Sequence, residues 1–165
     1  MPQEFIHQEA IKQAVESAKQ IMCFYRKAAE MVADEGGKRV FNRLADEKRA
    51  HVERFFRYYK GTEFGSFDEF IVTPCNEEAA VVKELDGIIS EEVKERKARE
   101  IALGKEQQME RILRSKAKNI VDPGVRIVFE QLALESQKHF AVIESEYARF
   151  MGMPHETDID TYVRE

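Results

Sequence analysis

Apolar side chains recur every three or four positions in four long segments of the chain, at about residues 8–33, 38–60, 90–119 and 123–151. That spacing places them along one face of an α-helix, with polar and charged residues on the other faces. Almost no segment alternates apolar and polar residues as a half-buried strand does. Four amphipathic helices bury their apolar faces most simply against one another. The pattern therefore predicts an all-α protein, a four-helix bundle that forms one domain over residues 1–165.

Glycine and proline mark the breaks between these segments. Gly36 and Gly37 are expected to end the first helix, and Gly61 is expected to end the second, because glycine readily adopts the positive φ of a helix stop. An Asp-Pro-Gly sequence at residues 122–124 breaks the chain between the last two helices. Each half of the chain thus has the form of a helical hairpin.

The two hairpins are joined by a much longer connection, residues 61–89. It holds glycines, one proline and a short stretch, Glu77 to Leu85, that could form one small helix. A crossover of this length suits a bundle whose two middle helices run parallel. Ser90 is a plausible N-cap for the third helix, and residues 152–165 are expected to form a loose tail.

Charge and composition narrow the range of partners. The net charge is −5 with basic residues scattered along the chain, so we expect no nucleic-acid partner. No apolar run approaches the roughly 20 residues needed to span a bilayer, and the N-terminus lacks a signal-peptide pattern, so we expect a cytoplasmic protein without a membrane partner. Cys23 and Cys75 form no C-x-x-C pair and are expected to be reduced thiols.

The second half of the chain repeats the first at an offset of 88 residues. Six identities fall within twelve positions of the second helix of each hairpin. The identical pairs are Val40 and Val128, Phe41 and Phe129, Leu44 and Leu132, Ala45 and Ala133, Glu47 and Glu135, and His51 and His139. A repeat of one helix pair is therefore predicted.

The repeat places two histidines, His51 and His139, at equivalent points within the apolar faces. Glu47 and Glu135 stand four residues before them, one helical turn away. Such Glu-His pairs are commonplace on helix surfaces, where they form salt bridges. Two core histidines at equivalent positions instead favour a metal site, because imidazole binds iron, zinc or copper and nearby carboxylates help to neutralise the ion.

Three segments resemble the rubrerythrin-like branch of the ferritin-like superfamily: AIKQAVESAKQIMCFYRKAAE, FNRLADEKRAHVERF and FEQLALESQKHFAVIE. The resemblance extends over residues 8 to 151. It implies a ferritin-like four-helix bundle with a non-haem di-iron site, used in oxidation or in the reduction of peroxide. It also implies a homodimer and, for redox turnover, a separate electron donor. Because neither cysteine belongs to a C-x-x-C pair, we expect no rubredoxin-type iron centre in these residues.

The family's ligand positions are only partly retained. The glutamate of the third helix falls on Glu106, and the two histidines fall on His51 and His139. The glutamate of the first helix falls on Ala18. The glutamates three residues before each histidine fall on two other substitutions, Lys48 and Ser136.

Glu47 and Glu135 lie at the edge of the helix stripes, where they could reach inward or simply face solvent. Glu106, by contrast, lies inside the stripe of the third helix, where an unpaired carboxylate is costly and requires a cation or a proton. Tyr25 could serve as a hydrogen-bonded core tyrosine or as a redox relay.

Two hypotheses follow. In the first, the chain binds one or two iron ions through Glu47, His51, Glu106, Glu135 and His139 and acts as an oxidoreductase on oxygen or peroxide; no catalytic residue is assigned. In the second, Lys48 pairs with Glu106 in place of metal, there is no cofactor, and the bundle serves as a dimeric or partner-binding scaffold. Whether the chain is an enzyme stays open at this point.

Overall fold

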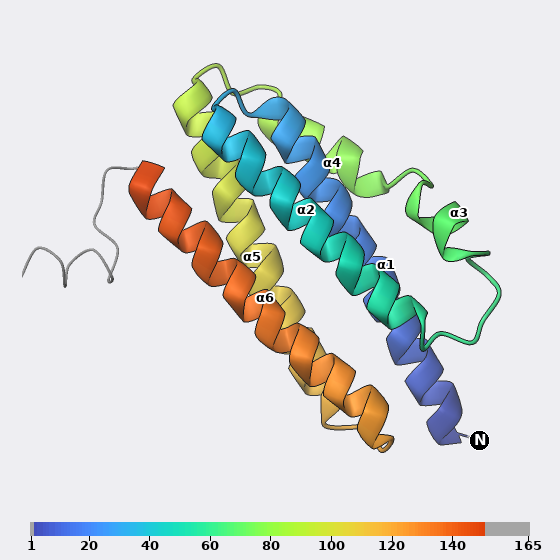
Figure 1. The fold of residues 1–165 in the computed structure, drawn as a ribbon. Helices are drawn as coiled ribbons and strands as arrows, with labels where there is room; N and C mark the ends of the chain where they lie inside the picture. The colour runs from blue at the N-terminus through green and yellow to red at the C-terminus, as the bar shows by residue number, and fades with distance from the viewer. Residues whose placement is uncertain (1, 151–165) are drawn as a thin grey trace, which may run out of the picture.

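The computed structural model describes residues 2–150 of the 165-residue chain. No strand occurs within that range, so the predicted all-α class is confirmed. Four long helices lie side by side as a bundle (Figure 1): α1 (Pro2–Met31), α2 (Glu35–Phe56), α5 (Glu91–Ala117) and α6 (Pro123–Phe150). The tail expected at residues 152–165 lies outside the described residues.

The first hairpin turns earlier than its glycines suggested. α1 ends at Met31, and Gly36 and Gly37 lie inside the first turn of α2. The reason is the Asp34 side chain, which caps α2 by accepting a hydrogen bond from the Gly37 amide at 2.8 Å. An N-cap aspartate accepts a hydrogen bond from a helix amide that has no partner within the helix. The second helix therefore begins before the two glycines, and the glycines do not end the first.

The crossover between the hairpins contains two short helices, α3 (Phe67–Ile71) and α4 (Asn76–Leu85). The second corresponds to the short helix expected from Glu77 to Leu85. In Figure 1 the crossover runs back along the length of the bundle, so that α2 and α5 run parallel, as its length suggested. Ser90 then caps α5, because its hydroxyl accepts a hydrogen bond from the Val93 amide at 3.3 Å.

A disulfide anchors this crossover to the first hairpin. Cys23 on α1 bonds to Cys75, the residue before α4, with 6.3 Å between the Cα atoms. The expectation of two reduced thiols is therefore wrong in this structure. The residues are 52 positions apart, and only the return of the crossover along α1 brings them together. Buried Val81 and Leu85 of α4 add an apolar attachment beside the bond.

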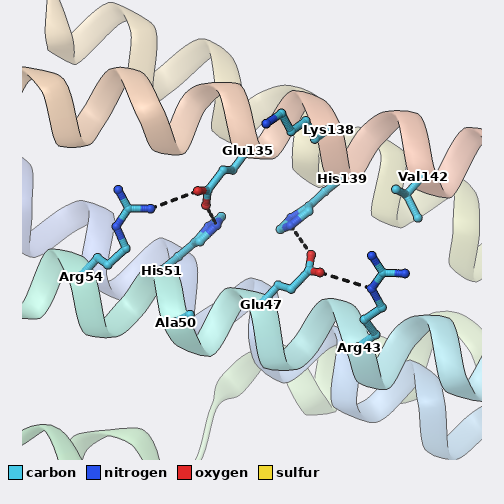
Figure 2. A pocket seen from close by; sticks show the side chains of 9 residues that line it. All are labelled: Arg43, Glu47, Ala50, His51, Arg54, Glu135, Lys138, His139 and Val142. Atoms are coloured by element: carbon cyan, nitrogen blue, oxygen red, sulfur yellow. Dashed lines mark hydrogen bonds and ion pairs between the residues drawn. The ribbon is translucent and has the colours of Figure 1, made fainter.

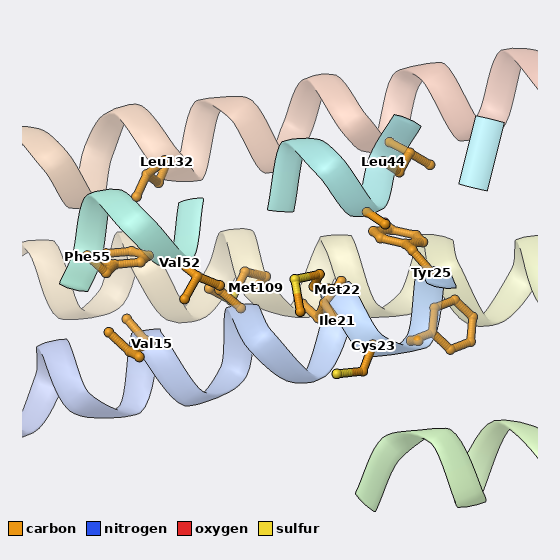
Figure 3. Packing of buried hydrophobic residues seen from close by; sticks show 14 of the residues in the cluster. Val15, Ile21, Met22, Cys23, Tyr25, Leu44, Val52, Phe55, Met109 and Leu132 are labelled. Carbon is orange, nitrogen blue, oxygen red and sulfur yellow. The ribbon is translucent and has the colours of Figure 1, made fainter. Parts of the chain in front are cut away.

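The core runs along the bundle axis and takes side chains from all four long helices (Figure 3). Fully buried examples from α1 and α2 are Val15, Met22, Val52 and Phe55. These are positions of the three- and four-residue spacing, which explains why the pattern identified the helices. None of the helices among the described residues is both long enough and apolar enough to cross a membrane.

Candidate functional site

The centre of the bundle holds a charged lysine. Lys48 of α2 is completely buried, and its ammonium nitrogen lies 3.0 Å from Oε2 of Glu106 on α5, which is also completely buried. The ammonium also donates to Oγ of Ser136 on α6 at 3.4 Å. The resemblance described above places a family glutamate at each of these two positions, Lys48 and Ser136. By that resemblance, the lysine takes the place of a carboxylate.

The Glu106 carboxylate is shared among three helices. Its Oε1 accepts a hydrogen bond from the Tyr25 hydroxyl of α1 at 2.5 Å and lies 3.4 Å from Nδ1 of His139 on α6. Burial alone would raise the pKa of Glu106, but Lys48, His139 and Tyr25 outweigh it and bring that pKa down to about 2. Burial lowers the pKa of Lys48 from its ordinary value, and the Glu106 carboxylate opposes this effect. Because Tyr25 is buried and its hydroxyl donates to Glu106, it is a hydrogen-bonded core tyrosine.

Two histidines lie beside this ion pair and face each other across the α2–α6 boundary. The rings of His51 and His139 are stacked, with their centroids 5.2 Å apart and their planes 8° from parallel. Both residues are buried. The two histidines occupy equivalent positions in the sequence repeat, and they are neighbours in the structure.

Each histidine is held by the glutamate of the opposite helix (Figure 2). Nε2 of His51 lies 2.5 Å from Oε2 of Glu135, and Nε2 of His139 lies 2.6 Å from Oε2 of Glu47. The sequence suggested pairs within one helix, but the structure crosses them between helices. Both glutamate side chains are more than one third exposed, so they lie at the edge of the bundle rather than in its centre.

Two arginines complete the crossed pairs, and neither was predicted from the sequence. Nε of Arg43 lies 3.3 Å from Glu47, and a terminal nitrogen of Arg54 lies 3.0 Å from Glu135. The spacing of Arg43 four residues before Glu47 was the only signal in the sequence. Together these groups form a pocket of about 530 Å³ between α2 and α6, which is lined by Arg43, Glu47, Ala50, His51, Arg54, Glu135, Lys138, His139 and Val142.

Burial and the crossed hydrogen bonds shift the pKa values of two groups in this pocket, His51 and Glu135. Burial is the main cause that lowers the pKa of His51 to about 4; the hydrogen bond to Glu135 opposes it, and the charge of Lys48 adds to it. His51 is therefore neutral at neutral pH and carries its single proton on Nε2, facing Glu135. That hydrogen bond, with Arg54, lowers the pKa of Glu135 to about 2.

The inner ring nitrogens are left without partners. Nδ1 of His51 and Nδ1 of His139 are buried and have no hydrogen-bond partner among the described residues. The 3.4 Å separation between His139 Nδ1 and Glu106 Oε1 does not have hydrogen-bond geometry. Buried polar atoms without partners are rare in folded proteins, so these two atoms require a functional or historical explanation.

The residues present do not fit a di-iron centre. Two bridged ions need several carboxylates, yet Ala18 contributes only a methyl group from α1, Ser136 a hydroxyl, and Lys48 a positive charge. The five predicted ligands, Glu47, His51, Glu106, Glu135 and His139, lie in one neighbourhood. Nevertheless, no three histidine, cysteine, aspartate or glutamate side chains within residues 2–150 converge as a metal site. Glu47 and Glu135 contact the histidines instead.

Comparison with known proteins identifies a family for this chain and no individual relative. No curated protein and no solved structure matches the chain. The family model described as Rubrerythrin matches residues 9–147. This range includes every residue of the central cluster, by which we mean Tyr25, Glu47, Lys48, His51, Glu106, Glu135, Ser136 and His139. Iron is the usual metal of that family. The chain belongs to the Rubrerythrin family.

Proposed function

We propose that this chain is a metal-free member of the Rubrerythrin family that works as a binding scaffold. One observation carries the proposal: the completely buried ion pair between Lys48 and Glu106, at 3.0 Å. The ammonium provides the positive charge that the buried carboxylate requires, so Glu106 needs no metal ion.

The same ion pair argues against iron at this position. An iron ion would share a water-free space with the Lys48 ammonium, where repulsion between like charges is strong. The carboxylates that bind and neutralise iron in the family are absent at Ala18 and Ser136. A metal would therefore have to displace Lys48 and bind with half of the usual ligands.

The rival function is an iron oxidoreductase that acts on oxygen or peroxide with electrons from a separate donor. It would use His51, His139 and Glu106, with Glu47 and Glu135 turned inward. In the structure those two glutamates hold the outer nitrogens of the histidines and are bonded to arginines. The rival thus requires both crossed pairs and the central ion pair to break.

For the binding role we propose a second copy of the chain as the partner. The outer face of α6 carries Ile127 and Leu134, which are 50% and 45% exposed and lie two helical turns apart on the same face. Large exposed apolar side chains on one face are typical of a contact surface. Leu134→Glu should reduce any dimer measured by light scattering during size exclusion. The exposed substitution Glu130→Gln on the same helix serves as control.

The metal question is tested on protein purified without an affinity tag. The protein is incubated with Fe(II) without oxygen, desalted, and analysed for metal by mass spectrometry. The positive control is the triple variant Ala18→Glu, Lys48→Glu, Ser136→Glu, which returns the family's carboxylates to the same scaffold. Circular dichroism on both proteins verifies that they are folded.

We expect the natural chain to retain less than a tenth of an iron ion per molecule and the triple variant to retain near-stoichiometric iron. Because folding does not depend on metal in this proposal, a chelator should leave the melting temperature of the natural chain unchanged. Near-stoichiometric iron in the natural chain would overturn the proposal and restore the oxidoreductase.

A further inference from the structure

We infer that the turn between α5 and α6 docks, head to tail, onto the connection between α4 and α5 of a second copy of this chain. The turn and its flanking helix ends, residues 111–126, are called the cationic end, and residues 84–92 are called the anionic end. The inference goes beyond the proposed contact through α6, because it pairs two different surfaces and can therefore extend to a third copy.

The first observation is a hollow at the cationic end, where α5 finishes and α6 begins. It has a volume of about 450 Å³ and is lined by Arg114, Ala117, Lys118, Arg126 and Glu130. The cationic end as a whole holds five basic residues and one acidic residue, Asp122, which gives it a net charge of +4. Three cationic side chains thus line the hollow together with a single carboxylate.

The cations of this hollow are only partly neutralised within the chain. Arg114 pairs with Glu110 at 3.2 Å, whereas Lys118 and Arg126 form no ion pair among the described residues. Arg126 instead donates to the Ile120 carbonyl at 2.9 Å. Helix dipoles favour cations at the end of α5 but disfavour one at the start of α6, where Arg126 lies. The cluster is therefore more than helix capping, and it suits an anionic partner.

The second observation is a complementary segment at the other end of α5. The anionic end holds four acidic residues and no basic residue, which gives it a net charge of −4. Glu84, Asp86 and Glu92 are exposed and form no ion pair among the described residues, and Glu91 contacts Lys94 at 3.5 Å. The charges of the two ends are thus equal and opposite.

Each end also presents an exposed apolar side chain among its charges. Ile89 of the anionic end is 96% exposed, and Val121 of the cationic end is 57% exposed. Apolar residues surrounded by charged ones are typical of a contact surface, because the apolar contact contributes affinity and the charges select and orient the partner. The two ends therefore match in both respects.

The two ends cannot neutralise each other within one chain. They flank α5, whose 27 residues extend for about 40 Å, far beyond the roughly 8 Å over which charges act at physiological salt. Figure 1 shows the α4–α5 connection and the α5–α6 turn at opposite ends of the bundle. A second copy supplies the missing partner. Because each copy that binds leaves one of its own ends free, the contact can repeat.

The test is static light scattering of the full chain at about 10 mM and about 1 M sodium chloride, where charges act over about 30 Å and about 3 Å. Every chain carries Leu134→Glu, so that failure of the α6 contact is not confused with failure of this one. With both ends intact, the mean mass should rise with protein concentration at low salt, to more than about twice its value at high salt. Circular dichroism verifies folding.

Two charge-reversal variants identify the surfaces. Arg114→Glu with Lys118→Glu cancels the net charge of the cationic end, and Glu84→Lys with Asp86→Lys cancels that of the anionic end. Each variant alone should keep its high-salt mass at low salt, because its one charged end has no partner. Mixed in equal amounts, the two variants should form one-to-one pairs that grow no further, since each retains a single charged end.

The control is Lys27→Glu with Arg49→Glu, which changes the net charge as much as the first variant does but lies in the first hairpin. It should associate as the chain with both ends intact does. A mass that does not depend on salt, association of either variant alone, or a mixture that stays monomeric would overturn the inference. Binding to phosphatidylserine vesicles without self-association would also overturn it, because the cationic end would then belong to a lipid surface.

Discussion

The imidazole ring of His51 lies flat against that of His139, with 8° between their planes, although the two residues are 88 positions apart. They are equivalent positions of the repeated helix pair, so the stacking shows how the two hairpins face each other. Each ring is held from the opposite helix by a glutamate. The pair links α2 to α6 through both rings and both carboxylates.

This arrangement predicts that the protein loses stability in mild acid. The pKa of His51 is about 4 in the folded chain, against an ordinary value of 6.5. As the pH falls below 6.5, the unfolded chain takes up a proton that the folded chain refuses. The contribution of His51 is therefore complete above pH 6.5 and is lost as the pH falls to about 4. Between pH 7.5 and 5.5 the loss is on the order of 1 kcal/mol.

Urea unfolding at pH 7.5 and pH 5.5 measures this effect. The control is His51→Asn, which keeps an N–H donor near Glu135 but does not titrate. The free energy of unfolding should fall further with pH in the natural chain than in the variant. An equal fall in both proteins would show that His51 is not the group responsible.

The buried ion pair predicts an asymmetric response to substitution. Lys48→Met should lower the free energy of unfolding by about 3 to 5 kcal/mol, because it leaves the Glu106 carboxylate buried without a counter-charge. Adding Glu106→Leu should recover most of that loss, since an apolar pair of similar volume has no charge to desolvate. The measurement is urea unfolding at pH 7.5.

Lys27→Met is the matched surface control, because its ammonium pairs with the exposed Glu30 at 3.0 Å. It should change the free energy of unfolding by less than about 1 kcal/mol. If the double variant is no more stable than Lys48→Met alone, the cost comes from lost packing of the lysine stem and not from the unpaired carboxylate.

Much of this centre could be predicted from the sequence, because helix periodicity places residues on faces. Lys48 and Glu106 lie inside apolar stripes, and their opposite charges suggested the contact that the structure contains. A lysine whose ammonium reaches solvent was the alternative, and the complete burial of Lys48 overturns it. The crossed histidine pairs could not be predicted in the same way. Spacing along one helix relates Glu47 to His51, but the partner that Glu47 reaches depends on how α2 and α6 dock.

Two other differences have the same kind of cause. Gly36 and Gly37 resemble a helix stop, yet the Asp34 cap places them inside α2. Cys23 and Cys75 have no spacing that predicts a bond, and only the tertiary path of the crossover brings them together. In both cases a contact that residue spacing does not encode, the Asp34 cap or the Cys23–Cys75 bond, determines the structure.

We expect opposite changes in the free energy of unfolding when two helical glycines, Gly37 and Gly104, are replaced by alanine. A Cβ atom at position 37 would clash with Oε1 of Glu95, a buried carboxylate that is itself bonded to Arg99 at 2.8 Å. Gly37→Ala must displace that buried pair and should lower the free energy of unfolding by about 1 to 3 kcal/mol. Nothing lies within 4 Å of a Cβ at Gly104, in the middle of α5.

Gly104→Ala should therefore stabilise the protein by about 0.5 to 1 kcal/mol through helix propensity alone. The two variants are compared by thermal unfolding under the same conditions. Equal effects of the two substitutions would mean that Glu95 moves away from Gly37 without cost.

The disulfide predicts that a reductant weakens the protein without altering its central cluster. Alkylation of the denatured, non-reduced chain should modify neither Cys23 nor Cys75, and alkylation after reduction should modify both, as measured by intact mass. The bond closes a loop of 52 residues, so its loss should lower the free energy of unfolding by about 4 kcal/mol.

The double variant Cys23→Ser, Cys75→Ser should reproduce that loss and be insensitive to reductant. Because the bond lies on the side of α1 that faces the crossover, the pH dependence attributed to His51 should persist in this variant. Alkylation of both residues before reduction would instead return the pair to the free thiols expected from the sequence.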